Sequence, residues 1–474
     1  MKEYLLNKKL FNRILIFFAI ANLLSLITLK YLYQSDYSIL IWLSFLLALV
    51  MTFVIIFLNK DIFSPLFIFS LMYFGYALGG YYYSTSEGFG KFLGFMDIDN
   101  DTIVFFMELG LLFVIINYLF FTIGYLITEK KQIVILKKNY TDFWIFFGQN
   151  YKIIVIPFLV ISLSYWYYLA VMTAGGLINL IIYFQAFPHQ IKESGLSTLP
   201  YHLYYAGIFI WLLGINLSNK KITYLFIIMS FIGLIMNLSQ GRITLSVTYV
   251  ISQLIFIALL NKDHKKKIIF FIIFLLSFAF VIYFMRIYSN YLFIGKEFSL
   301  DSFSFLNVII GGGNVADLQQ LVIIFTTFDM NNILLGQTFF DWVRNTFGSF
   351  IGLTPSSIGL IIKQLYIPST SGAPTPGAIG ELYANFLFTS PMFMFFIGSI
   401  FAFIRNKSLS SGHPFVLLIY SIFLSRFVFV YPKVDSTMMS NFFWGVAPSM
   451  LSIAIFYLLY KLVYRRRVIE NKNI

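Results

Sequence analysis

The sequence contains a long succession of apolar segments, most of them long enough to cross the hydrocarbon core of a bilayer as a helix, which takes about 17–25 residues. Hydrophobic residues fill 59% of the 474 positions and charged residues only 11%, against about 25% charge in soluble domains. We therefore expect an all-α integral membrane protein with about twelve transmembrane helices. The expected spans are residues 12–29, 37–58, 62–83, 102–128, 153–174, 201–218, 222–239, 242–260, 268–286, 386–404, 414–431 and 442–460.

Lysine and arginine are distributed unevenly among the loops that connect these spans. With the N-terminus in the cytoplasm, the cytoplasmic loops hold 23 of the 33 basic residues but only 6 of the 20 acidic ones. This is the asymmetry that the positive-inside rule predicts, so both ends of the chain are expected in the cytoplasm. The net charge of +13 then indicates orientation and gives no support to nucleic-acid binding.

Several kinds of chemistry are disfavoured by residues that the sequence lacks. It has no cysteine and only four scattered histidines, so neither a thiol nucleophile nor a metal site is expected. It also has no glycine-rich phosphate loop that ends in Lys-Ser or Lys-Thr. We expect no cofactor, and any substrate must reach the protein already activated.

The longest connection, residues 287–385, is expected on the outer side between the ninth and tenth spans. It contains the stretches FLNVIIGGGNVADLQQLVIIF and FIGLTPSSIGLIIKQLY, which are too short or too interrupted to cross the membrane. We therefore predict a partly helical extracytoplasmic loop with amphipathic or re-entrant segments. The predicted division is a bundle over 1–286, the loop over 287–385, and the C-terminal helices with a basic tail over 386–474.

Four of the nine arginines are expected on the outer side, where positive charge is disfavoured. Arg242 lies in the turn SQGRITL, Arg286 ends the ninth span, and Arg344 lies in the long loop. Arg426 lies inside the eleventh span, where an ionisable group is costly and indicates function. Arginine binds phosphate bidentately, so all four are candidate ligands for an anionic substrate. The alternative is contact with lipid headgroups or a local ion pair, for instance between Arg344 and Asp341.

The candidate acid–base groups are a carboxylate and an imidazole. Glu381 lies in SGAPTPGAIGELYANF, where the outer loop is expected to re-enter the membrane, and partial burial there would favour a general base. The alternative is that Glu381 caps the N-terminus of the next helix. His189, in FPHQIKE, is the second candidate, with a plain interfacial histidine as its alternative.

Four features together resemble the Wzy-type O-antigen and capsule repeat-unit polymerases: SQGRITLSVTYVIS, the arginine after the ninth span, the long outer loop, and TPGAIGELYANF. The resemblance implies a GT-C-like, metal-independent glycosyltransferase in the cytoplasmic membrane of a bacterium. Its substrates would be oligosaccharides linked to undecaprenyl pyrophosphate, bound through the outer arginines. The implied partners are membrane lipids, a flippase and a chain-length regulator. The resemblance leaves the general base open, with Glu381 first and His189 second.

Two other functions remain open from the sequence. An O-antigen ligase-like transferase would use the same chemistry on a different acceptor. A flippase for lipid-linked oligosaccharides would also have about twelve helices, but transporters of that kind show internal repeats, and none is evident here.

Outer aromatic residues are candidates for stacking on sugar rings: Tyr201, Tyr204, Tyr205, Trp342 and Tyr383.

Overall fold

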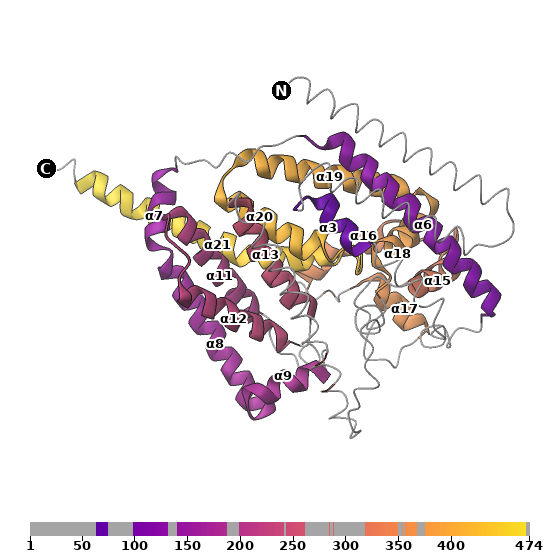
Figure 1. Cartoon of the computed structure of the whole chain (residues 1–474), viewed down its shortest axis with the longest axis horizontal. Coiled ribbons are helices and arrows are strands. Elements are labelled where there is room, and N and C mark those ends of the chain that lie inside the picture. Colours follow the sequence, from indigo (N-terminus) through magenta and orange to yellow (C-terminus); the bar gives the residue numbers. More distant parts are fainter. Residues whose placement is uncertain are drawn as a thin grey trace. The chain divides into compact units, whose positions relative to one another are not determined.

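The regular secondary structure of the described residues is entirely helical (Figure 1). Four helices are long and apolar enough to cross a membrane, which confirms the expected class of a helical membrane protein. They are Phe105–Thr128, Lys152–Met172, Gly377–Ser411 and Met438–Leu462, and they coincide with four of the expected spans. The computed structural model describes residues 63–73, 98–130, 140–186, 199–240, 243–260, 284, 288, 318–348, 353, 356–366 and 375–470.

Three shorter apolar helices, Tyr224–Leu238, Thr244–Leu260 and Pro414–Val428, match the expected spans 222–239, 242–260 and 414–431. The expected spans 12–29 and 37–58 lie outside the described residues, as do half of 62–83 and all of 268–286 except residue 284. The full set of about twelve spans therefore stays a prediction.

Contacts along the chain divide it into two compact units. Unit 1 comprises Met1–Gln132, Ser304–Lys407 and Val428–Ser440, and unit 2 comprises Ile133–Phe303, Ser408–Phe427 and Asn441–Ile474. Each unit thus gathers segments that are distant in the sequence. The division predicted from the sequence concerns membrane topology and stays a prediction.

Unit 1 is assembled on its longest helix, α6 (Asn100–Thr128), against which α3 (Pro65–Tyr73) and α15 (Leu318–Thr327) pack. Stacked rings hold α3 to α6, with Phe69 and Phe121 4.0 Å apart between centroids. The other short helices of this unit are α16 (Gln337–Phe347), α17 (Ile358–Tyr366) and α18 (Gly377–Phe386). Helices α15, α16 and α17 fall within the expected outer loop, and each has 9 to 11 residues, too few to span a bilayer.

Helix α19 (Ser390–Ser411) lies directly against the backbone of α6. A Cβ atom on Gly124 would come within 2.0 Å of the Phe395 carbonyl oxygen, and one on Gly398 within 2.1 Å of the Phe121 carbonyl oxygen. Small residues allow membrane helices to approach this closely. Hydrogen bonds advance along both helices in the same direction, from Ser399 with Gly124 to Asn406 with Thr128, so α6 and α19 run parallel.

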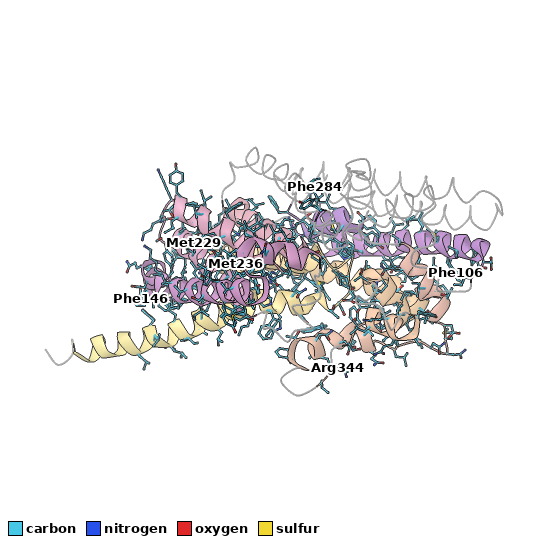
Figure 2. All side chains as sticks on the ribbon, turned by 90° about the horizontal axis from the view of Figure 1, so that it is seen from below. Phe106, Phe146, Met229, Met236, Phe284 and Arg344 are labelled. Carbon is cyan, nitrogen blue, oxygen red and sulfur yellow. The ribbon has the colours of Figure 1, made fainter. Side chains whose placement is uncertain are left out.

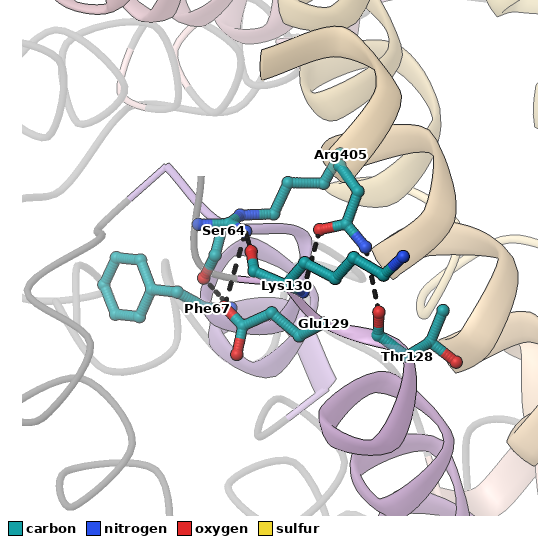
Figure 3. A network of polar contacts seen from close by, with 7 residues as sticks. Ser64, Phe67, Thr128, Glu129, Lys130 and Arg405 are labelled. Atoms are coloured by element: carbon teal, nitrogen blue, oxygen red, sulfur yellow. Dashed lines mark hydrogen bonds and ion pairs between the residues drawn. The ribbon is translucent and has the colours of Figure 1, made fainter. Parts of the chain in front are cut away.

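The C-terminal ends of these two helices are joined by a polar network (Figure 3). Asn406 Nδ2 donates to the carbonyl of Thr128 at 2.9 Å, and its Oδ1 accepts from the backbone N–H of Lys130 at 3.0 Å. Arg405 forms an ion pair with Glu129 at 3.5 Å and donates to the carbonyl of Lys130. The two helix ends therefore lie on the same side of the membrane.

Unit 2 is organised around α11 (Leu199–Leu217), most of whose residues are buried. Helix α11 packs against α7, α8, α12 and α20, and α13 packs against α12 and α20. Figure 2 shows the side chains, with Phe146 on α7 and Met229 and Met236 on α12. The other helices of this unit are α7 (Asp142–Asn150), α8 (Lys152–Ala174), α9 (Leu177–Ala186), α12 (Tyr224–Leu238), α13 (Ile243–Leu260), α20 (Pro414–Phe423) and most of α21 (Met438–Glu470).

Candidate functional site

Arg426 lies in a short π-helical turn, Leu424–Val428, which continues α20. Its side chain is only 3% exposed. π-Helical turns inside α-helices are rare and often occur at functional sites, because they redirect a side chain that a regular helix would place elsewhere. Here the turn presents a guanidinium to the interior of unit 2.

Helices α11 and α21 form the surroundings of this guanidinium. Its central carbon lies 3.7 Å from the centre of the Tyr205 ring, a cation–π contact, and NH1 donates to the carbonyl of Asn441 at 3.3 Å. Gly445, one turn further along α21, leaves room for the arginine, since a Cβ there would lie 2.9 Å from Arg426 Cδ. Arg426 is thus fixed by packing and stacking more than by hydrogen bonds.

The hydrogen-bonding capacity of Arg426 is largely unused. A guanidinium has five N–H donors, yet Nε has no partner, and within the described segments no carboxylate pairs with the side chain. A buried charge without a counter-charge is costly. The Nε edge of Arg426 is therefore suited to an anion that is not part of the described residues.

Tyr205, the ring that stacks on Arg426, contacts further polar groups in the core of unit 2. The Tyr205 hydroxyl is hydrogen-bonded to Ser252 Oγ at 2.8 Å, and the Tyr205 and Tyr249 rings are 5.6 Å apart. Within the described part of the chain, the buried hydroxyls of Tyr249 and Ser246 have no hydrogen-bond partner. Polar groups therefore continue from Arg426 through Tyr205 to Ser252 in the core of this unit.

Glu381 lies in unit 1, on α18, and is fully buried. The backbone N–H of Ser436 donates to Oε2 at 2.8 Å, and its hydroxyl donates to Oε1 at 2.7 Å. The Ser436 hydroxyl also lies 3.3 Å from the carbonyl oxygen of Thr338. The carboxylate therefore ties α18 to the turn after Val428, which belongs to the same unit.

The alternative expectation, that Glu381 caps a helix N-terminus, is wrong. Pro376 is the N-cap of α18, and Gly377 follows it with a φ of 74°, a conformation that favours glycine. Glu381 lies one turn into the helix, where the backbone N–H groups are already paired within the helix. Its carboxylate consequently binds Ser436 instead of the helix end.

Two further carboxylates lie close enough to Glu381 to repel it: Asp435, 4% exposed, and Asp341, 7% exposed. Asp435 Oδ1 accepts hydrogen bonds from the backbone N–H and the hydroxyl of Thr437. Burial raises the pKa of Asp435 above its ordinary value, although these two hydrogen bonds lower it. Among the residues that the structure describes, Asp341 Oδ2 has no hydrogen-bond partner.

This cluster does not resemble a metal centre. In the part of the chain that the structure describes, no three His, Asp or Glu side chains are arranged to hold a metal ion. An amide positions the helices instead: Asn385 Nδ2 donates to Thr338 Oγ1 at 2.6 Å, and its Oδ1 accepts from the backbone N–H of Thr338 at 3.2 Å. Helix α16 is thereby joined to α18.

Arg344, on α16, does not form the ion pair with Asp341 that the sequence left open. No ion pair joins them among the described residues, and both Arg344 Nε and Asp341 Oδ2 lack hydrogen-bond partners. Arg344 is partly exposed, and it is labelled in Figure 2. Arg344 and Arg426 lie in different units, and Arg242, Arg286 and His189 lie outside the described residues.

The aromatic candidates for sugar stacking are mostly covered. Tyr201, Tyr204 and Tyr205 are at most 3% exposed, Tyr383 is 6% exposed, and one face of Tyr205 is occupied by Arg426. Sequence reasoning did not identify the stacking of Tyr205 on Arg426, the space that Gly445 leaves for Arg426, or the hydrogen bonds from Ser436 to Glu381.

Comparison of the chain with models of known families, with curated proteins and with solved structures found no match.

Proposed function

We propose that this protein is a Wzy-type polymerase of lipid-linked oligosaccharide repeat units. It has about twelve transmembrane helices in a GT-C-like arrangement, with both termini in the cytoplasm of a bacterium and its site on the outer face of the cytoplasmic membrane. The growing glycan on undecaprenyl pyrophosphate is transferred to the non-reducing end of another lipid-linked repeat unit.

Arg426 is the observation that carries this proposal. Arg426 has no acidic partner among the described residues, and a membrane-embedded arginine of this kind is costly, so its retention needs a ligand that compensates the charge. A lipid-linked pyrophosphate is such a ligand, because guanidinium donors bind phosphate oxygens in a bidentate manner. Arg242, Arg286 and Arg344 are the other proposed pyrophosphate ligands.

The proposed reaction depends mainly on charged groups that are held in fixed positions around the substrates. The bond between the anomeric carbon and the pyrophosphate oxygen breaks, and a bond from that carbon to the acceptor hydroxyl oxygen forms. The hydroxyl proton passes to a base, and undecaprenyl pyrophosphate leaves with its charge neutralised by the arginines. Fixed donors aimed at charge that develops in the transition state contribute several kcal/mol in a site that excludes water.

Glu381 is the first proposed base and His189 the second. Each oxygen of an ionised carboxylate has room for more than one hydrogen bond, so Glu381 can accept from a substrate hydroxyl while Ser436 holds it in place.

The parallel packing of α6 and α19 supports the proposed topology. Because both helices end on the same side, the chain between residues 131 and 389 must cross the membrane an odd number of times. The proposed topology has five spans there, from 153–174 to 268–286. An introduced cysteine is unique in this chain, which has none of its own. Cysteines placed at Gln132 and Ser411 should therefore react from the same side of sealed vesicles.

The function is tested by the length distribution of surface polysaccharide in a deletion strain that expresses the wild-type chain, Arg426→Ala or Glu381→Gln. We expect long chains with the wild type, and single repeat units with either variant at equal abundance in the membrane. A deletion that blocks the outward movement of repeat units would indicate a flippase instead. Normal chain lengths in both variants would exclude the proposed mechanism.

A further inference from the structure

Helix α16 buries polar side chains and exposes apolar ones, the reverse of a helix on a water-soluble surface. Its buried residues are Thr338, Asp341 and Thr346. Phe340, Val343 and Phe347 are 61%, 45% and 41% exposed. Their spacing of three and four residues places all three on one face of the helix.

This orientation is fixed by hydrogen bonds inside unit 1. The Thr338 hydroxyl accepts from Asn385, and the Thr346 hydroxyl is hydrogen-bonded to Ser440 Oγ at 2.7 Å. Rotating α16 to hide the phenyl rings would break both contacts and would leave buried polar groups without partners. The apolar face is therefore a stable feature of the surface.

Aromatic rings connect α16 to the membrane-crossing helix that contains α18 and α19. The Phe339 centroid lies 5.2 Å from that of Phe340 and 5.8 Å from that of Phe386, and Phe386 stacks on Phe393 at 3.6 Å. The same crossing helix exposes large apolar side chains, including Phe396 at 55%. The apolar face of α16 thus continues a surface that faces lipid.

We propose that α16 lies in the membrane–water interface, with Phe340, Val343 and Phe347 inserted among lipid acyl chains. Its 11 residues are too few to cross the bilayer, but an apolar helix face of this size is enough to lie along its surface. Arg344 borders that face, so it lies at the depth of lipid phosphates, where it can reach the lipid-linked pyrophosphate that the proposed function assigns to it. The occupant is lipid, because the surface that continues this face belongs to a spanning helix.

Nitroxide accessibility tests this proposal on the full-length protein in nanodiscs of phosphatidylethanolamine and phosphatidylglycerol. Single cysteines replace Phe340, Val343 or Phe347, each exposed and so suited to labelling. Phe396→Cys serves as the lipid-facing control, and the exposed Asn331→Cys as the aqueous control. The readout is the ratio of collisions with oxygen, which concentrates in lipid, to collisions with a water-soluble nickel chelate.

We expect ratios at positions 340, 343 and 347 that approach the ratio at 396 and exceed the ratio at 331 several-fold. Ratios equal to that of position 331 at all three sites would overturn the proposal. A contact with a second copy of the chain would also protect these sites from the chelate. Nanodiscs that hold one copy separate the two cases, because protection that disappears there identifies a protein contact and overturns the assignment to lipid.

Discussion

Two buried arginines, one in each unit, differ in how their charge is compensated. Arg405, 6% exposed, pairs with Glu129 and donates to the carbonyl of Lys130 at the end of the α6–α19 pair. Arg426, 3% exposed, has a tyrosine ring, one carbonyl and no described carboxylate. Complete local compensation indicates a structural role, whereas an uncompensated charge indicates a ligand.

Arg405→Ala is expected to give the largest loss of stability. Glu129 is 2% exposed, and removing its partner leaves a buried charge uncompensated. Breaking a buried pair in this way costs about 3–5 kcal/mol. Thermal unfolding in detergent, followed by tryptophan fluorescence, measures the effect. An Arg405→Ala protein that unfolds at the wild-type temperature would contradict the structural role of Arg405.

Arg426→Ala should show the opposite pattern, with the fold preserved and polymerisation slowed. Loss of one preorganised donor to developing negative charge typically lowers a rate about 10²–10³-fold. Purified protein with lipid-linked repeat units provides the rate, and the unfolding temperature provides the control. If Arg426→Ala lowers the unfolding temperature as much as Arg405→Ala does, with no separate effect on rate, both arginines are structural.

The sequence predicted the roles that local residue patterns indicate, and it missed those that depend on packing between distant segments. Arg426 stood out because LSRFVFV is apolar on both sides of the charge, and Glu381 because GAIGELYANF follows a loop. Both signals are local. Tyr205 and Gly445 gave no comparable signal, because a tyrosine and a glycine within apolar helices are ordinary, and only packing shows that they accommodate a guanidinium.

The same limit applies to the helices of the outer loop. The stretch QTFFDWVRNTF was not among the amphipathic candidates, and its outward apolar face could not be predicted, since the polar partners Asn385 and Ser440 lie far along the chain. The membrane spans were easier to predict, because length and apolar composition alone define them.

Glu381 offers a pair of substitutions that separates structure from chemistry. In Glu381→Gln, the amide oxygen can accept from the Ser436 N–H while the amide NH₂ donates to the Ser436 hydroxyl, so stability should stay near that of the wild type. Glu381→Leu leaves the Ser436 N–H buried and unsatisfied, a cost of about 1–3 kcal/mol, while the hydroxyl keeps only the longer contact with the Thr338 carbonyl. The measurement is unfolding temperature together with polymerisation rate.

For a general base, Glu381→Gln should lower the rate about 10²–10⁴-fold without loss of stability. A normal rate in Glu381→Gln combined with an unstable Glu381→Leu protein would make Glu381 purely structural. The proposed reaction would then need another base, and His189 is the remaining candidate.

Gly445→Ala tests whether the position of Arg426 matters. The new methyl group would lie 2.9 Å from Arg426 Cδ and 3.1 Å from NH1, so the arginine must shift. Overpacking of this kind costs about 1–3 kcal/mol, toward the low end here because a long side chain can move. Gly176→Ala is the matched control, because its methyl group would meet nothing within 4 Å.

We expect slower polymerisation in Gly445→Ala and an unchanged rate in Gly176→Ala. Equal rates in the two variants would show that the guanidinium tolerates displacement. That result would weaken the case that Arg426 is a preorganised ligand.

The smallest effect concerns Asp435 and appears as a dependence of stability on pH. Burial holds the pKa of Asp435 above its ordinary value of 3.8, so the folded state retains a proton that the unfolded state has already lost. Stability therefore falls as the pH rises from the unfolded pKa through the folded one. The loss is about 1.4 kcal/mol per unit of pKa shift.

Asp435→Asn removes the ionisable group but keeps an oxygen that accepts from Thr437. We expect its unfolding temperature to vary less with pH than that of the wild type, and to exceed the wild-type value near neutral pH. Glu381→Gln is the companion measurement, because it changes the charge that Asp435 faces without opening a cavity. An unchanged pH profile in Asp435→Asn would mean that the hydrogen bonds from Thr437 balance the effect of burial, and that the carboxylate cluster of unit 1 is as well compensated as Arg405.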